Sequence, residues 1–179
     1  MKNRFAKSAA VIFISIFFVA SSAAQETCEL KSKTAPILLN LRLEMSPEQA
    51  RSVFRNDLKV KVKKRGERTF FQNYIKKPAP ASLSGVRALY LRFFDARLYQ
   101  IEIFYEPKPD LKTLADVADL LSAQLNLPAV DWKVENNQAR IICADASLVA
   151  DNILNPRVEL TNETIRAEVE RLREESKKK

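Results

Sequence analysis

Apolar and polar residues alternate along several stretches of the chain, and the period of the alternation indicates the secondary structure of each stretch. In residues 58–64, LKVKVKK, apolar side chains occupy every second position up to 62 with lysines between them, which is typical of a strand with one buried face. Residues 86–106 hold two longer runs, rich in aromatic and β-branched side chains, around a short turn, and this predicts an antiparallel hairpin. Residues 132–149 predict two more strands around a turn at residues 136 and 137.

The hairpin can form in two registers, and the apolar pattern distinguishes them. A two-residue turn at residues 95 and 96 would place Leu91 opposite Gln100 and mix polar with apolar side chains on one face. A three-residue loop, residues 95–97, places Leu91 opposite Ile101 and keeps that face apolar. Because burial of one face specifies the register of a strand pair, we predict the three-residue loop. The turn contains no glycine, so a residue there must adopt a positive φ at a modest energetic cost.

Apolar residues spaced three and four apart predict helices, the first of which follows Ser46. The serine oxygen can accept a hydrogen bond from a free backbone N–H at the start of the helix. Pro47 lacks the donor that would stay unpaired at the first helical position, and Gln49 can reach back to the cap. Val53 and Phe54 lie on one face of this short helix, which we expect to be buried.

Two longer helices follow in the sequence. Asp110 is the expected N-cap of a helix over residues 111–125, whose wide apolar stripe suits packing on a sheet and which Pro128 prevents from continuing. A third helix starts near Asn162, and its lysine-rich end suits the negative end of the helix dipole. These elements predict an α+β fold in which an antiparallel β-sheet has helices packed on one face, within a single domain.

The amino terminus does not follow these patterns. Basic residues precede an apolar run over residues 9–20 and small residues follow it, which is the composition of a signal peptide cleaved before Gln25. The run is too short to cross a bilayer, because a spanning helix needs ~20 apolar residues. Cys28 follows QET, whereas the cysteine of a lipoprotein signal follows small and apolar residues. We therefore expect an exported protein, periplasmic or secreted, with no transmembrane span in its mature chain.

This assignment sets the expected organisation of the chain. The signal peptide covers residues 1–24, an N-terminal arm residues 25–40, the α+β domain residues 41–160, and a C-terminal amphipathic helix with a basic tail residues 161–179. Removal of the signal peptide leaves 155 of the 179 residues, about the size of one ordinary domain. Three of the 30 basic residues leave with the signal, so 27 remain against 22 acidic ones and the net charge falls from +8 to +5.

Much of the remaining positive charge lies in one segment. A possible basic binding patch comprises Lys59, Lys61, Lys63, Lys64, Arg65 and Arg68. Such a patch can bind nucleic acid, an anionic lipid or polymer, or an acidic protein, and export makes nucleic acid the least expected of these partners. Alternatively, the lysines serve only to keep an edge strand from pairing with other chains.

The chain has two cysteines, Cys28 and Cys143, and export would carry them to a compartment where thiols oxidise. We predict a structural disulfide between them, which would close a loop of over a hundred residues; free thiols are the alternative. No C-x-x-C pair is present, so the usual signature of a thiol oxidoreductase is missing.

Missing residue types exclude several kinds of catalytic site. The chain has no histidine, which excludes Ser-His-Asp and Cys-His nucleophilic sites and H-E-x-x-H metal sites. Its two glycines, Gly66 and Gly85, are too far apart to build a phosphate-binding loop or a dinucleotide turn. No pattern indicates a cofactor or a metal. A pair of carboxylates remains possible, although Asp95 and Glu102 fit ordinary surface acids.

A resemblance to a known family can be identified within residues 41–105. The segment LRLEMSPEQARSVF and the hairpin LYLRFFDARLYQIEIFYE resemble the small outer-membrane-assembly lipoproteins of the BamE or SmpA type and, more loosely, β-lactamase-inhibitor-like domains. The matching positions are Leu43, Met45, Ser46, Gln49 and Asp95. The chain departs from the family pattern at Glu44 and Ala96, where glycines are expected, and it lacks the lipid-bearing cysteine. The resemblance implies an exported helix-on-sheet module that binds other proteins, and it transfers no site residues.

These observations favour a non-catalytic protein that binds another envelope or secreted protein and needs no cofactor. One alternative is an exported carboxylate-dependent hydrolase acting on cell-wall or carbohydrate material. Another is a module that docks electrostatically to an anionic lipid or polymer through the basic patch.

Overall fold

The computed structural model describes residues 30–54, 58–62, 67–74, 79, 83–143, 145–151 and 153–178, without the side chains of residues 60–62 and 130. The expected signal peptide and Cys28 lie outside these ranges, as do Lys63, Lys64 and Arg65 of the basic patch. The expectations that depend on these residues therefore stay predictions. None of the described helices combines the length and the apolar character that crossing a bilayer requires.

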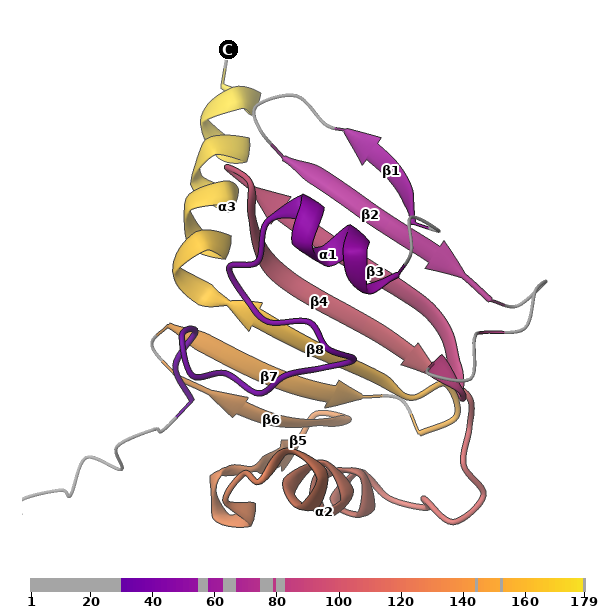
Figure 1. Ribbon diagram of the computed structural model, residues 1–179. Helices are drawn as coiled ribbons and strands as arrows, with labels where there is room; N and C mark the ends of the chain where they lie inside the picture. Colours follow the sequence, from indigo (N-terminus) through magenta and orange to yellow (C-terminus); the bar gives the residue numbers. More distant parts are fainter. Residues whose placement is uncertain are drawn as a thin grey trace, which may run out of the picture.

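The described residues form one antiparallel sheet of eight strands together with three α-helices (Figure 1). The strands lie in the order β1-β2-β3-β4-β8-β7-β6-β5. Their bounds are β1 Lys59–Val62, β2 Arg68–Asn73, β3 Val86–Phe94, β4 Arg97–Tyr105, β5 Lys133–Glu135, β6 Gln138–Ile142, β7 Ala146–Asp151 and β8 Arg157–Asn162. The helices are α1 Pro47–Val53, α2 Leu114–Leu125 and α3 Glu163–Lys177, and a short 3₁₀ turn, η2, covers Ala129–Asp131. This architecture confirms the predicted α+β fold.

The sheet consists of two halves with the same element order. Helix α1 precedes the strands β1 to β4, and helix α2 precedes the strands β5 to β8. In each half, consecutive strands pair as neighbours, and the last strands of the two halves, β4 and β8, pair in the middle of the sheet. Each half is therefore a β-meander, and the pairing of β4 with β8 joins the two meanders into one sheet.

Both halves bury the same face of the sheet, which we call the core face. Successive register partners on this face form an apolar row in which no member is more than 3 % exposed: Phe70, Leu91, Ile101, Leu160, Leu148 and Ile141. Helix α1 lies in front of β3, between β2 and β4 (Figure 1), and the Arg51 guanidinium lies 5.4 Å from the centre of the Phe70 ring on β2. Helix α2 packs on β6 and β7, as its apolar stripe predicted.

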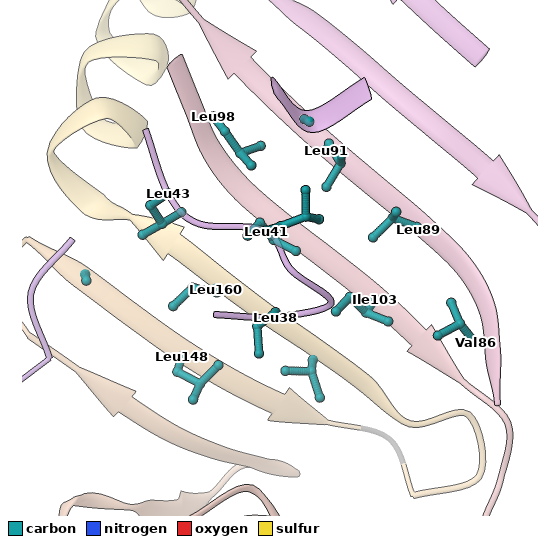
Figure 2. Close-up of a cluster of buried hydrophobic side chains, with 14 of the residues drawn as sticks. Leu38, Leu41, Leu43, Val86, Leu89, Leu91, Leu98, Ile103, Leu148 and Leu160 are labelled. Atoms are coloured by element: carbon teal, nitrogen blue, oxygen red, sulfur yellow. The ribbon is translucent and has the colours of Figure 1, made fainter. Parts of the chain in front are cut away.

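The segment before α1 crosses the core face between the two helices. Leu38, Leu41 and Leu43 are buried, and Figure 2 shows them above the leucines and isoleucines of β3, β4, β7 and β8. Two backbone hydrogen bonds, of 2.7 and 2.9 Å, join residues 44 and 45 to Leu98 at the start of β4. This segment is therefore part of the core and reaches both halves of the sheet.

The start of α1 is as predicted, and the start of α2 is not. Ser46 Oγ accepts a hydrogen bond of 3.2 Å from the Gln49 N–H, while the Gln49 side chain accepts one of 2.8 Å from the Ser46 N–H. The N-cap of α2 is Thr113 rather than Asp110, and Asp116 completes the capping box there. A hydroxyl followed three residues later by a carboxylate forms the same reciprocal pair as in α1, which explains why the helix begins three residues later than expected.

The β3–β4 hairpin combines the predicted pairing with a different turn. Leu91 lies opposite Ile101, as predicted. The predicted three-residue loop is wrong: the turn consists of Asp95 and Ala96 alone, and their φ angles are 47° and 56°. Both turn residues thus adopt the left-handed conformation that a two-residue hairpin turn requires.

A β-bulge in β4 reconciles the short turn with the apolar register. Phe93 pairs with Leu98, whereas the preceding residue of β3, Arg92, pairs with Gln100. Tyr99 is therefore an extra residue without a partner in β3. It is 2 % exposed and packs against α3 instead of the main core. The bulge keeps the apolar residues on the core face and supplies an anchor for α3.

Two further features differ from the predictions. Strands β2 and β8 were not expected, and residues 132–149 contain β5, β6 and part of β7 where two strands were predicted.

The helix expected near Asn162 is confirmed as α3, and Asn162 is its N-cap. Helices α1 and α2 lie over the core face, whereas α3 packs against Tyr99 and borders the opposite face.

Candidate functional site

The face of the sheet opposite the core, which we call the open face, carries an unusual mixture of side chains. One row of register partners crosses it from edge to edge: Lys59, Phe71, Tyr90, Glu102, Glu159, Val149, Arg140 and Lys133. Except for Glu102, the members of this row are half-buried or exposed. The open face therefore presents aromatic groups on β2 and β3 and charged groups in the centre.

The centre of the open face is an ionic cluster around Arg157, which lies at the start of β8. The Arg157 guanidinium donates to Glu102 Oε1 at 3.0 Å and to Asp151 Oδ1 at 3.1 Å, and lies 3.5 Å from Glu159 Oε2. Arg92 forms a second ion pair with Glu102 at 3.4 Å. Hydrogen bonds to Asp151, opposed by partial burial and reinforced by Glu102, raise the pKa of Arg157 above its ordinary value.

The strand register explains why an arginine is needed at this position. Glu102 and Glu159 are direct partners on β4 and β8, and like charges directly opposite each other destabilise a strand pair. Arg157 precedes Glu159 by two residues and therefore points to the same face. It bridges both glutamates and Asp151. The cluster still holds three carboxylates against the guanidinium groups of Arg92 and Arg157, so one negative charge is uncompensated within it.

An aromatic group lies next to the ionic cluster. The rings of Phe71 and Tyr90 stack with their centres 6.2 Å apart, and Phe104 approaches Tyr90 edge-on at 5.9 Å. All three side chains are half-buried. Each ring is held by another ring, so this group presents a largely fixed apolar surface to solvent.

A cleft lies on the other side of the cluster, between α3 and the strands β6 to β8. Its volume is about 600 Å³. It is lined by Gln138, Arg140, Ile142, Cys143, Ser147, Val149, Arg157, Glu159, Glu163, Arg166 and Ala167. The apolar part consists of the side chains from the middle of β7, the end of β6 and the first turns of α3, and the rest of the lining is charged or polar.

Contacts at both ends of α3 fix the helix that borders this cleft. Asn162 accepts a hydrogen bond from the Ile165 N–H at 3.0 Å and donates to Glu44 at 3.3 Å, and Ser147 donates to Glu163. Asn162 is only 3 % exposed, so this cap is part of the buried structure. Toward the other end, Arg173 pairs with Glu67, which also accepts a hydrogen bond from the Tyr99 hydroxyl at 3.4 Å.

The residues predicted to bind a partner are separated in the structure as far as it describes them. Lys59 pairs with Phe71 and shares the open face, whereas Arg68 is two residues from buried Phe70 and belongs to the opposite face of the hairpin. The remaining members of the basic patch lack described side chains, so the patch stays a prediction. Cys143 is buried and Cys28 lies outside the described residues, so their disulfide also stays a prediction.

The two acids expected to be ordinary surface carboxylates occupy different environments. Asp95 is exposed in the β3–β4 turn, as expected. Glu102 is only 7 % exposed and is held by two arginines, so the expectation was wrong for this residue. The sequence reasoning also missed Arg157, Asp151 and Glu159. The alternation of charged and apolar residues in RVELTN could have identified β8, but the partners of its charges depend on long-range pairing.

Within the described ranges, no three acidic or cysteine side chains gather in a way that could hold a metal ion. Comparison of the chain with protein-family models, curated proteins and solved structures gave no match. The chemistry of the open face is therefore the basis for a functional proposal.

Proposed function

We propose that this protein is an exported, non-catalytic module that binds another protein of the cell envelope or the secreted fraction through its open face. The observation that carries the proposal is that the fixed, half-buried aromatic rings lie next to the ionic cluster around Arg157 in the middle of that face. Aromatic residues and arginine are the types most enriched among the residues that dominate binding energy at protein interfaces.

The dimensions of the open face suit an ordinary protein interface. Eight strands at about 4.8 Å spacing extend roughly 34 Å, and strands of six residues are about 20 Å long, which gives a face of ~700 Å². Stable complexes bury about 800 Å² on each partner. A partner seated on this face and on the adjoining surface of α3 would reach that area without a rearrangement of the fold.

Site-specific photo-crosslinking tests the proposal. A photoreactive phenylalanine analogue replaces Phe71 on the open face or, as the control, Asp119 on the exposed side of α2. After incubation with envelope extract and irradiation, we expect one adduct of defined mass from position 71 and none of that mass from position 119. Equal adducts from both positions, or none from position 71, would contradict the proposal.

Tyr90 supplies a second arm of the same experiment. Tyr90→Ala should lower the yield of the position-71 adduct by about tenfold or more, because it removes the ring that both neighbouring aromatics contact. Tyr90→Phe retains the stacked ring and should retain most of the yield. An unchanged yield in Tyr90→Ala would mean that the partner does not use the aromatic group.

One observation bears on the alternative of a carboxylate-dependent hydrolase. Glu102 and Glu159 are register partners on one face, as a catalytic pair would be. Arg157 lies between them and donates to Glu102, however, and Glu102 also pairs with Arg92. This arrangement favours a role of the two acids in charge pairing and recognition. Turnover of cell-wall glycan that is lost in Glu159→Gln would favour the hydrolase instead.

A further inference from the structure

The cleft beside α3 has a charge balance that can be followed pair by pair. Two of its arginines are neutralised at the rim, since Arg140 pairs with Glu135 on β5 and Arg166 pairs with Glu163 at 2.6 Å. The third arginine, Arg157, belongs to the ionic cluster, which has one carboxylate in excess. The lining residues themselves carry three arginines and two glutamates, and the uncompensated carboxylate lies in the ionic cluster, where Glu102, Asp151 and Glu159 face Arg92 and Arg157.

This excess charge falls on Glu159. Its carboxylate lies 3.5 Å from Arg157, the longest of the Arg157 contacts in the cluster, and accepts a hydrogen bond of 3.2 Å from Thr161. A carboxylate has roughly four acceptor sites, so Glu159 retains capacity for further donors. Its strand partner Glu102 has two arginines, and the repulsion between the two glutamates would decrease if a further cation bound at Glu159.

The walls of the cleft suit the aliphatic part of a long basic side chain. Val149 is half-buried on the strand beside Glu159, and Ile142 on β6 is 56 % exposed. Ala167 forms part of the helix side. Lysine and arginine bury their methylene stems on such surfaces while the charged group pairs beyond them.

We propose that the cleft receives a lysine or arginine side chain of the bound partner protein, whose cationic group pairs with Glu159 and whose stem packs on Val149 and Ile142. The proposal rests on the proposed function of the open face and specifies the chemistry of its partner. Arginine fits better than lysine, because its guanidinium can contact the Glu159 carboxylate through two N–H groups.

Binding of short peptides measured by NMR tests the proposal on the mature full-length protein. The probe is the blocked peptide Ala-Leu-Arg-Leu-Ala, and the matched peptides carry citrulline or glutamate in place of arginine. We expect the arginine peptide to shift the amide signals of β6 to β8 and the first turns of α3. Citrulline has the same shape without the charge, and its peptide should bind about tenfold more weakly. Raised salt should weaken only the arginine peptide.

Two variants locate the interaction. Glu159→Gln should reduce binding of the arginine peptide to the level of the citrulline peptide, whereas Glu168→Gln, on an exposed position of α3, should leave it unchanged. The amide spectrum of each variant reports directly whether the fold is retained. Equal binding of the citrulline peptide, tighter binding of the glutamate peptide, absence of binding, or shifts away from the cleft would each overturn the proposal.

The same variants separate this proposal from the proposed function. If position 71 still forms its adduct in Glu159→Gln at the full yield, the cleft does not contribute to partner binding and the proposal fails, while the function of the open face stands. If position 71 forms no adduct in the otherwise unchanged protein, the proposed function fails, whatever the peptides do.

Discussion

At the scale of single residues, two residues of the β3–β4 turn have a backbone conformation that is unfavourable for any residue other than glycine. Asp95 and Ala96 have φ angles of 47° and 56°, and neither is glycine. Asn136 and Asn137 adopt the same region in the β5–β6 turn, where asparagine tolerates it comparatively well. Alanine gains no local hydrogen bond there, so Ala96 is expected to carry about 1 kcal/mol of strain.

Ala96→Gly should therefore stabilise the protein, even though glycine usually lowers stability. We expect a rise of about 0.5–1 kcal/mol in the free energy of unfolding, since the relief of strain is partly offset by the flexibility of glycine in the unfolded chain. Ala167→Gly on the exposed side of α3 is the matched control and should lower that free energy by about 1 kcal/mol. Urea denaturation measures both, and a loss of stability in Ala96→Gly would contradict the strain.

Tyr105 gives a prediction for alkaline pH. Burial raises the pKa of Tyr105 from 10 to about 12, because the charged phenolate is disfavoured against the core. A group with a raised folded pKa contributes stability that is complete below its unfolded pKa and is lost as the pH rises through the folded pKa. Stability should thus fall between about pH 10 and 12, and Tyr105→Phe should flatten this fall. Urea titrations across that range, with phenolate absorbance as a second signal, would measure the difference.

At the scale of elements, α3 depends on one residue of a strand that it does not follow in sequence. Tyr99, the extra residue of the bulge, packs with Ile165 and Val169, and its hydroxyl donates to Glu67, which also holds Arg173. Burial, with Glu67 beside it, raises the pKa of Tyr99. The helix that borders the cleft is therefore positioned by an irregularity in β4.

Tyr99→Ala should loosen α3 specifically. We expect a loss of about 3–5 kcal/mol in the free energy of unfolding, the usual cost of removing a buried aromatic side chain. Trypsin should then cut first at the arginines of α3, which the sequence supplies at 166, 171 and 173. Tyr90→Ala, on the half-buried open face, should cost less and leave the cleavage pattern unchanged. Identical first cleavage sites in the two variants would mean that Tyr99 does not hold the helix.

At the scale of the whole molecule, the segment before α1 joins the two halves of the sheet. Its leucines cover β4 and β8 at their junction, and Ser32 accompanies them with a hydrogen bond of 3.2 Å from its N–H to Asp145. This contact lies two residues from Cys143 and four from Cys28 in sequence. It supports the predicted disulfide, which would tie the same segment to the second half.

The disulfide can be tested on the intact protein. The oxidised chain should weigh less than the reduced one by two hydrogen atoms and should resist alkylation until it is reduced. Reduction should lower the free energy of unfolding by up to about 4–5 kcal/mol, because the bond closes a long loop. A variant with serine at Cys28 and Cys143 should not respond to reductant. Two alkylated thiols in the untreated protein would rule out the bond.

The sequence by itself determined the features that depend on neighbouring residues. The cap at Ser46, the course of α3 and the pairing of Leu91 with Ile101 follow from local hydrogen bonds and from the apolar period, and the structure confirms each. The start of α2 was misplaced because Asp110 and Thr113 are both suitable caps, and only the second has a carboxylate three residues later.

Tertiary structure alone decided the register irregularity and the candidate site. A bulge at Tyr99 lets a two-residue turn coexist with an apolar core face, and its energy depends on α3, some 65 residues later in the chain. The cluster around Arg157 likewise exists because β4 and β8, the strands at the ends of the two halves, pair in the centre of the sheet. Charge and the apolar period of the sequence indicate which side chains point away from the core, but the residues that those side chains contact depend on long-range strand pairing.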